Sequence, residues 1–314
     1  LCSSAGNDIL YDESQIEQGR NFGNKIWNAF RLITGWTVDA SLEQSEACAV
    51  AVRWFANKLN AVAAEVNDHF AKFRISDALM AAYKLFWDDF CAWYLELVKP
   101  AYGSPIDSKT YETTLEYFES LLKMIHPIMP FITEELWHAV RERGENATIM
   151  FERYPAAGES DAKYIADFNL ACEVVAGVRN IRQQKGLSPR EPLRLFIVGE
   201  WPKDMEAVVV KLANVSEIQH VTSVDDSLAG VSFMAGTVKA FVPLEGLVDA
   251  AEEIAKLEGE LKYLQGFLKS VRGKLSNEKF VSHAPEAVVA SERKKEADAL
   301  SKIESIEHSL KALK

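Results

Sequence analysis

The sequence has 314 residues, of which 48% are hydrophobic and 26% charged, and its formal net charge is −11. This length is enough to bury a core and predicts two or three domains. Charged side chains interrupt every apolar run before it reaches the roughly 20 residues that a membrane-spanning helix needs, so membrane insertion is not expected.

The first residues, LCSSAGNDILYDE, have no initiator Met and no signal-peptide pattern, and we interpret them as a cut inside a longer protein. The cysteines lie far apart and form no C-x-x-C pair, which excludes the usual spacing of a zinc knuckle or a redox dithiol. We expect reduced thiols in a cytosolic protein at these positions: Cys2, Cys48, Cys91 and Cys172.

The first predicted helix contains the stretch GRNFGNKIWNAFRLI, residues 19–33, which has three basic residues and three asparagines but no acid. Its apolar side chains fall on one side of a helix and should pack into a core: Phe22, Ile26, Ala29, Phe30 and Ile33. The opposite side forms a polar arc: Arg20, Asn21, Asn24, Lys25, Asn28 and Arg31, with Trp27 at its border. Cations, amides and a stacking ring are what single-stranded nucleic acid requires. Contacts of these residues with a neighbouring domain and with acids elsewhere explain the pattern equally well.

The remainder of residues 14–155 is also helical in pattern, with apolar stripes at steps of three and four. The first two stripes are Phe55, Leu59, Val62, Val66, Phe70 and Phe73, then Leu79, Tyr83, Phe86, Phe90, Trp93 and Leu97. A third begins at Leu115, Phe118, Leu122 and Ile125, and it must break near Pro127 and Pro130 before FITEELWHAV resumes as a helix. Such stripes are typical of an antiparallel helical bundle.

Residues 156–246 predict a small α+β unit. A helix ending near Lys185 is followed by LRLFIVG, by helical KDMEAVVVKLAN, and by three short runs, EIQHV, VSFMA and TVKAFVPL. The last two runs are predicted to form a hairpin across Gly236. Five basic residues lie in the segment VRNIRQQKGLSPREPLR, which we interpret as a solvated helix end: Arg179, Arg182, Lys185, Arg190 and Arg194.

From residue 247 onward the pattern is a heptad, which predicts the seam of a left-handed coiled coil. The seam positions are Leu247, Ala250, Ile254, Leu257, Leu261, Leu264, Leu268, Val271 and Leu275, and the returning limb has Ala299, Ile303, Ile306, Leu310 and Leu313. The stretch SNEKFVSHAP interrupts the heptad between the two limbs. We therefore expect the limbs to pack against each other within one chain as an antiparallel hairpin. Residues 250–314 carry 12 Lys and Arg against 11 Asp and Glu, whereas the whole chain carries 35 against 46. Solvated flanks explain this charge, but the arm is the less repulsive surface for a polyanion.

Three motifs, GRNFGNKIWNAFRLI, DALMAAYKLFWDDFCAWYLELVKP and HPIMPFITEELW, occur in the order and approximate spacing seen in class I aminoacyl-tRNA synthetases for branched aliphatic amino acids. The third motif is common to the valyl, isoleucyl and leucyl families. The heptad after VPLEGLVD and the stretch KLSNEKFVSHAPEAVVASERKK resemble the C-terminal coiled-coil arm of bacterial valyl-tRNA synthetases. The resemblance covers nearly the whole chain.

The resemblance implies a mainly α fold with three units: an anticodon-binding helical bundle over 14–155, an α+β connector over 156–246, and a coiled-coil tRNA-binding arm over 247–314. Residues 1–13 would follow a missing catalytic domain. That domain and the editing domain would hold the adenylation chemistry, with ATP and Mg, so this fragment is expected to be inactive alone. Valine tRNA and the missing domains are the implied partners of a cytoplasmic monomer.

The RNA-binding residues that we expect from the acid-free arc and the charge of the arm are the polar arc with Trp27 in the bundle and, in the arm, Lys269, Arg272, Lys274, Arg293 and Lys294. We expect no catalytic, cofactor or metal site in this fragment. Glu134 and Glu135 point about 100° apart on a helix and make a poor acid/base pair. The histidines are interpreted as structural: His126, His138 and His283. Two other interpretations remain open: the same region of an isoleucyl enzyme, and a coiled-coil protein-interaction module.

Overall fold

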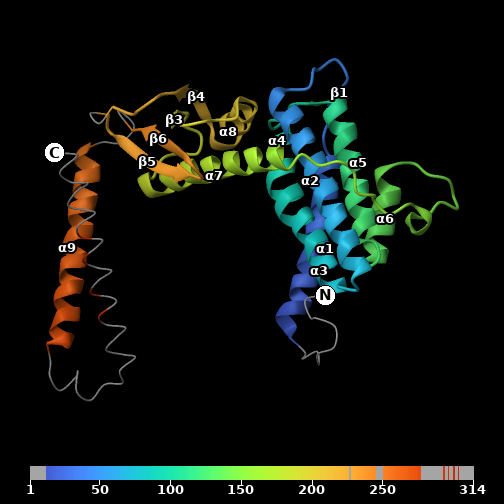
Figure 1. The fold of residues 1–314 in the computed structure, drawn as a ribbon, viewed down its shortest axis with the longest axis horizontal. Helices are drawn as coiled ribbons and strands as arrows, with labels where there is room; N and C mark the ends of the chain where they lie inside the picture. The colour runs from blue at the N-terminus through green and yellow to red at the C-terminus, as the bar shows by residue number, and fades with distance from the viewer. Residues whose placement is uncertain are drawn as a thin grey trace.

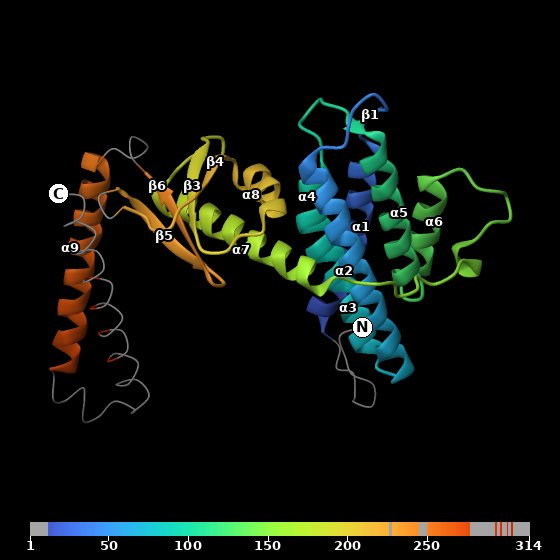
Figure 2. The same ribbon diagram turned by 45° about the horizontal axis from the view of Figure 1, so that its top comes forward.

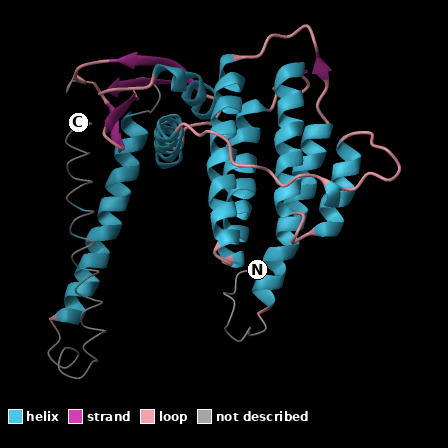
Figure 3. Ribbon diagram, turned by 45° about the vertical axis from the view of Figure 1, so that its right-hand side comes forward, coloured by secondary structure: helices cyan, strands magenta, loops and turns pink. Residues whose placement is uncertain are grey.

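The structure, a computed structural model, describes residues 12–225, 228–244 and 250–276 and the single positions 293, 296, 300 and 303. It is mainly helical, with two small sheets (Figure 3). Most of the predicted residues 1–13, the predicted boundary at 247, most of the returning limb, Cys2, His283 and Lys294 lie outside the described residues.

The first helices pack side by side around one core and make up what we call the helical unit (Figure 1). Its helices are α1 (Glu13–Thr34), α2 (Glu46–Ala71), α3 (Ile75–Lys84), α4 (Leu95–Val98), α5 (Ser108–Ile125) and α6 (Pro130–Val140), with a π-helix, η1 (Leu85–Tyr94), between α3 and α4. Two short strands, β1 (Val38–Asp39) and β2 (Ile106–Asp107), pair in parallel, and a 3-10 turn, η2 (Ile149–Phe151), follows α6.

Side chains that accept hydrogen bonds from the first free backbone N–H groups fix where several helices begin. Asp12 accepts from Ser14 N before α1, Ser45 from Cys48 N before α2, and Asp107 from Thr110 N before α5. The predicted break is confirmed, because α5 ends at Ile125 and α6 starts with Pro130 at its first turn, where a missing N–H costs least.

Two of the predicted apolar stripes differ from the structure. Phe73 lies beyond the end of α2 with a φ of 57°, and its side chain is 87% exposed. The stripe that begins at Leu79 runs into the π-helix, whose i→i+5 spacing rotates the buried face. Trp93 is therefore only half-buried. Tyr83 lies in α3, before the π-helix, and is also half-buried, because Ala78 and Ala82 form the buried side of that helix. Phe86, Phe90 and Leu97 of the predicted stripe are buried, as expected. The residues buried beside them are Leu85, Cys91, Tyr94, Leu95 and Val98.

The second part of the fold, the sheet unit, has four strands in the order β4-β3-β6-β5. They are β3 (Leu193–Val198), β4 (Val215–His220), β5 (Gly230–Ala235) and β6 (Val238–Pro243). A 3-10 turn, η3 (Lys203–Met205), and α8 (Glu206–Ala213) connect the parallel pair β3 and β4. The predicted hairpin is confirmed, since β5 and β6 pair antiparallel across Gly236, whose φ is 50°.

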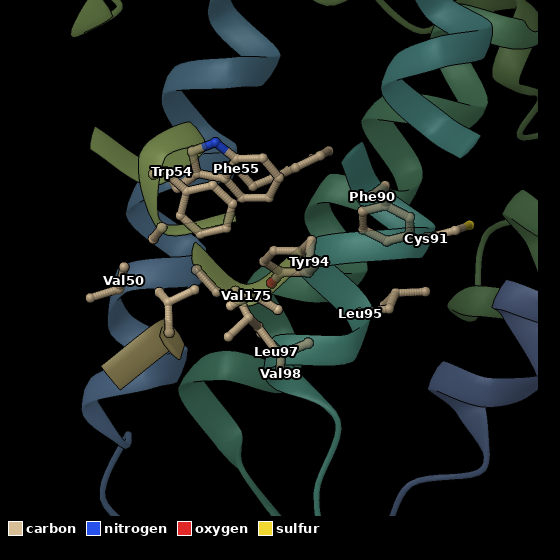
Figure 4. Close-up of a cluster of buried hydrophobic side chains, with 14 of the residues drawn as sticks. Val50, Trp54, Phe55, Phe90, Cys91, Tyr94, Leu95, Leu97, Val98 and Val175 are labelled. Atoms are coloured by element: carbon tan, nitrogen blue, oxygen red, sulfur yellow. The ribbon is translucent and has the colours of Figure 1, made fainter. Parts of the chain in front are cut away.

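One helix, α7 (Ala162–Lys185), is shared by both units and runs from the helices to the sheet (Figure 2). Near its start, Phe168 stacks on Trp54 of α2 with ring centroids 3.8 Å apart. Val175 lies in the same buried cluster as side chains of α2, η1 and α4 (Figure 4). Farther along, a Cβ at Gly177 would lie 2.1 Å from the ring of Phe233, so α7 and β5 pack too closely for a larger residue. The sheet is therefore held on the helical unit by a continuous core.

The last described helix, α9 (Ala250–Leu275), lies on the far side of the sheet from the helical unit and extends away from it (Figures 1 and 2). Three predicted seam positions are buried: Leu264, Leu268 and Val271.

Candidate nucleic-acid interface

Helix α1 divides into a buried and an exposed side, as the sequence predicts. Phe22, Ile26, Ala29 and Ile33 are buried against the core, and Phe30 packs at its edge. The opposite side is exposed at Arg20, Asn21, Asn24, Trp27, Asn28 and Arg31, and half-buried at Lys25. The structure thus places these seven predicted residues on one solvent-facing side of a single helix.

The charge on this side is almost entirely positive. Arg20 lies 3.6 Å from Glu17, one turn before it, but both side chains are well exposed, so the pair is screened and weak. Within the described residues, no carboxylate forms an ion pair with Lys25 or Arg31. Their cations therefore remain available to an anionic ligand in a chain of net negative charge.

Aromatic rings flank the polar arc at both edges. At one edge, Trp27 is 43% exposed, and its ring lies 5.9 Å from that of Phe30. At the other edge, the ammonium of Lys25 lies 5.3 Å from the ring centroid of Trp87, which stacks on Tyr83 at 5.6 Å. The sequence analysis missed this second edge, because Tyr83 fits a core stripe and Trp87 belongs to a different helix. The sequence does contain a signal for this edge, because Tyr83 and Trp87 are aromatic residues four positions apart and so lie on the same side of a helix.

The basic segment before β3 is only partly the solvated helix end that the sequence suggested. Arg182 is buried, and its guanidinium donates hydrogen bonds to the carbonyls of Ser188, Ala213 and Asn214 at 2.7 to 3.1 Å. Burial lowers the pKa of Arg182 from its usual value. Arg179 donates to the carbonyl of Leu212 from two nitrogens. Both arginines donate to carbonyls at the end of α8, those of Leu212, Ala213 and Asn214, which is a structural role.

The structure describes four of the five predicted RNA-binding residues of the arm. Lys269, Arg272 and Lys274 are exposed on α9, and Arg293 is exposed on the return. Arg272 Nε donates to the carboxylate of Glu296 at 2.7 Å. Part of the charge of Arg272 is therefore neutralised by a contact between two limbs of the arm.

The acidic and histidine side chains in and just before α6 form local hydrogen bonds. Glu134 accepts hydrogen bonds from the Thr148 hydroxyl and the Ile149 backbone N–H, and it lies 3.2 Å from His138 Nε2. His126 is hydrogen-bonded to Thr133 at 2.7 Å. Among the described residues, no group of three or more His, Cys, Asp or Glu side chains is arranged to hold a metal ion.

Three of the cysteines lie in the described part of the chain, where each is a free thiol: Cys48, Cys91 and Cys172. Burial raises the pKa of Cys91 and of Cys172 to about 12, which makes both thiols poor nucleophiles at neutral pH. Within the described residues, each helix falls short of the length and apolarity that crossing a bilayer requires.

Two parts of the chain match known protein families. Residues 52–197 match the family model of the anticodon-binding domain of tRNA ligase, and residues 249–314 match that of the valyl tRNA synthetase tRNA binding arm. The polar arc of α1 precedes both matches. The chain is 52% identical to the valine–tRNA ligase of Parabacteroides distasonis, 51% to that of Phocaeicola vulgatus and 50% to that of Bacteroides thetaiotaomicron. Each alignment covers all of this chain and 36% of the relative, so the chain spans about a third of the length of the relatives it matches.

Proposed function

Because this chain belongs to the valine–tRNA ligase family, we propose that it is a tRNA-binding portion that recognises valine tRNA at two places. The helical unit meets the anticodon loop through the polar arc of α1, and the arm meets the outer corner of the tRNA. The observation that carries the first contact is that the exposed side of α1 brings cations, amides and aromatic rings together.

The arc combines three kinds of contact with an unpaired loop. Arg20, Lys25 and Arg31 bind phosphates, which gives affinity but no sequence information. Asn21, Asn24 and Asn28 present amide donors and acceptors to base edges, which gives discrimination. Trp27 offers an exposed ring face at the border of the arc, where an unpaired base stacks.

The arm acts as an antiparallel coiled-coil hairpin. The buried seam positions of α9 and the pairing of Arg272 with Glu296 support this arrangement. At the tRNA corner, Arg272 and Arg293 are the candidate stacking cations and Lys269, Lys274 and Lys294 the candidate phosphate contacts. The corner is held by shape, charge and stacking, because A-form helices present little sequence to side chains in their deep major groove.

The aminoacylation reaction requires the full-length enzyme, of which this chain is a part. We assign the attachment of valine to its tRNA, with ATP and Mg, to the full-length enzyme, and the adenylation and editing sites to its portion outside this chain. The fragment alone binds tRNA without activating valine. It acts as a cytoplasmic monomer.

Two measurements test this assignment against the other interpretations. Equilibrium binding to transcribed valine and isoleucine tRNAs should show tighter binding of valine tRNA, whereas the reverse preference would indicate an isoleucyl enzyme. Sedimentation without RNA should give a monomer, since the arm zips within one chain. Self-association through the arm without RNA binding would support a protein-interaction module instead.

A further inference from the structure

The end of α9 has an unusual charge pattern for a protein of net charge −11. Residues 261–277 contain four cations, Lys262, Lys269, Arg272 and Lys274, and no Asp or Glu. This acid-free stretch lies between Glu260 and Glu278 and covers the last turns of the helix. It is the counterpart, in the arm, of the acid-free stretch in α1.

Three stripes run along this part of α9, each displaced from the next by one residue and so by about 100° around the helix. The first is the buried seam, Leu264, Leu268 and Val271. The second lies one residue earlier at each step and consists of Tyr263, Phe267 and Ser270. The third lies one residue earlier again and contains Lys262 and Lys269, separated by Gly266.

The second and third stripes face solvent. Tyr263 is 72% exposed and Phe267 is 38% exposed, and Lys262 and Lys269 are exposed as well. No heavy atom lies within 4 Å of the position that a Cβ on Gly266 would occupy, so the surface between the two lysines is low and open. We call Lys262, Tyr263, Phe267 and Lys269 the aromatic–lysine face.

Arg272 lies outside this face. It is rotated toward the limb that contains Glu296, and its Nε donates to that carboxylate at 2.7 Å, which holds the guanidinium on the side of the other limb. Two aromatic side chains one turn apart, with lysines beside them and no acid in the stretch, match the needs of exposed bases and their phosphates.

We propose that the aromatic–lysine face of α9 is where the arm contacts folded RNA, with Tyr263 and Phe267 stacking on exposed bases and Lys262 and Lys269 binding the adjoining phosphates. The proposal deepens the proposed function and rests on it. It adds the aromatic pair to Arg272 and Arg293 as candidate stacking residues of the arm. An RNA partner is favoured over an acidic protein because an aromatic ring stacks on any exposed base, while the adjacent lysines bind the phosphates that accompany the bases.

The test uses the full chain and two ligands, a whole valine tRNA transcript and a short hairpin that carries only its anticodon stem and loop. Tyr263→Ala and Phe267→Ala should each weaken binding of whole tRNA about tenfold and leave binding of the hairpin unchanged. Tyr263→Phe should retain the affinity, because it keeps the ring. Lys269→Ala should lower the slope of log affinity against log salt by about 1.

Tyr102→Ala is the matched control, because Tyr102 is a fully exposed tyrosine in the helical unit, and it should change neither affinity. Unchanged binding of whole tRNA by both alanine variants would overturn the proposal, and so would an equal loss for the hairpin. If the unchanged chain instead forms dimers in sedimentation, and the alanine variants lose the dimers but still bind tRNA, the face is a protein contact and the proposal is overturned. If the unchanged chain binds neither RNA, the proposed function itself fails.

Discussion

The ammonium of Lys25 lies 5.3 Å from the ring centroid of Trp87, so a residue of the π-helix holds a cation of α1 at the edge of the polar arc. Tyr83 stacks on the same indole ring at 5.6 Å and supports it. A cation held over a ring loses less side-chain freedom when a phosphate binds, which favours affinity.

This relationship predicts that Lys25 and Trp87 act as a unit in RNA binding. Lys25→Ala and Trp87→Leu should each weaken binding of the anticodon hairpin and lower its salt slope, and the double variant should lose little more than either single one. Trp87→Phe should restore part of the loss. Trp93→Leu, which removes a similar contact with Arg179 outside the arc, is the control and should leave RNA binding unchanged. Fully additive losses would show that the two residues act independently.

Asn28 should discriminate between bases. Asn28→Ala is expected to cost about 1 to 3 kcal/mol on the matched anticodon and much less on a mismatched one, because an amide that reads a base edge contributes only when the edge fits. Filter binding to hairpins that differ at single anticodon positions measures this. Asn146→Ala removes an exposed amide elsewhere and serves as the control. Equal losses on all hairpins would exclude Asn28 from base recognition.

Arg182 should matter for stability rather than for RNA. Arg182→Ala removes the donor to the Ala213 carbonyl at the buried end of α8 and one of two donors to each of the Ser188 and Asn214 carbonyls, so the free energy of unfolding should fall by about 1 to 3 kcal/mol. Arg182→Lys should recover little, because a single ammonium does not span three acceptors. Urea unfolding provides the measurement, with the exposed Arg194→Ala as control. A change in the salt slope of tRNA binding for a folded Arg182 variant would contradict the structural role.

The buried thiols and phenols predict a loss of stability at alkaline pH. Burial raises the pKa of Cys91 and of Tyr154 to about 12, so the folded chain keeps protons that the unfolded chain releases near pH 9 to 10. The unfolded state then binds fewer protons, and the free energy of unfolding should decrease as pH rises from about 9 toward 12. Urea midpoints at pH 8, 9, 10 and 11 should fall steadily, and Tyr154→Phe should reduce the slope. A constant midpoint up to pH 11 would contradict these pKa directions.

Much of the helical part was predictable because each pattern depends on one helix at a time. The division of α1 into an apolar and a polar side needs only the helical repeat, and the buried Leu264, Leu268 and Val271 follow from the heptad. The β5–β6 hairpin was predictable from alternation on both sides of Gly236.

The missed features depend on departures from the regular repeat or on contacts between distant segments. The π-helix over Leu85–Tyr94 rotates the buried face in a way that a 3.6-residue repeat does not contain. Phe73 fits the apolar stripe of α2 but lies past its last turn. Arg182 resembles a solvated helix end until α8 supplies carbonyls to it, and Trp87 acquires its contact only when η1 packs beside α1.

The central claim is that the polar arc of α1 reads the anticodon. Its most direct test is equilibrium binding of this chain to transcribed valine tRNA and to the same tRNA with a changed anticodon, at low and at high salt. The account predicts tighter binding of the matched tRNA at both salt concentrations, with both affinities falling as salt rises. Equal affinities for the two tRNAs at each salt concentration would contradict it, and would leave the arm and its charge as the contact that binds tRNA.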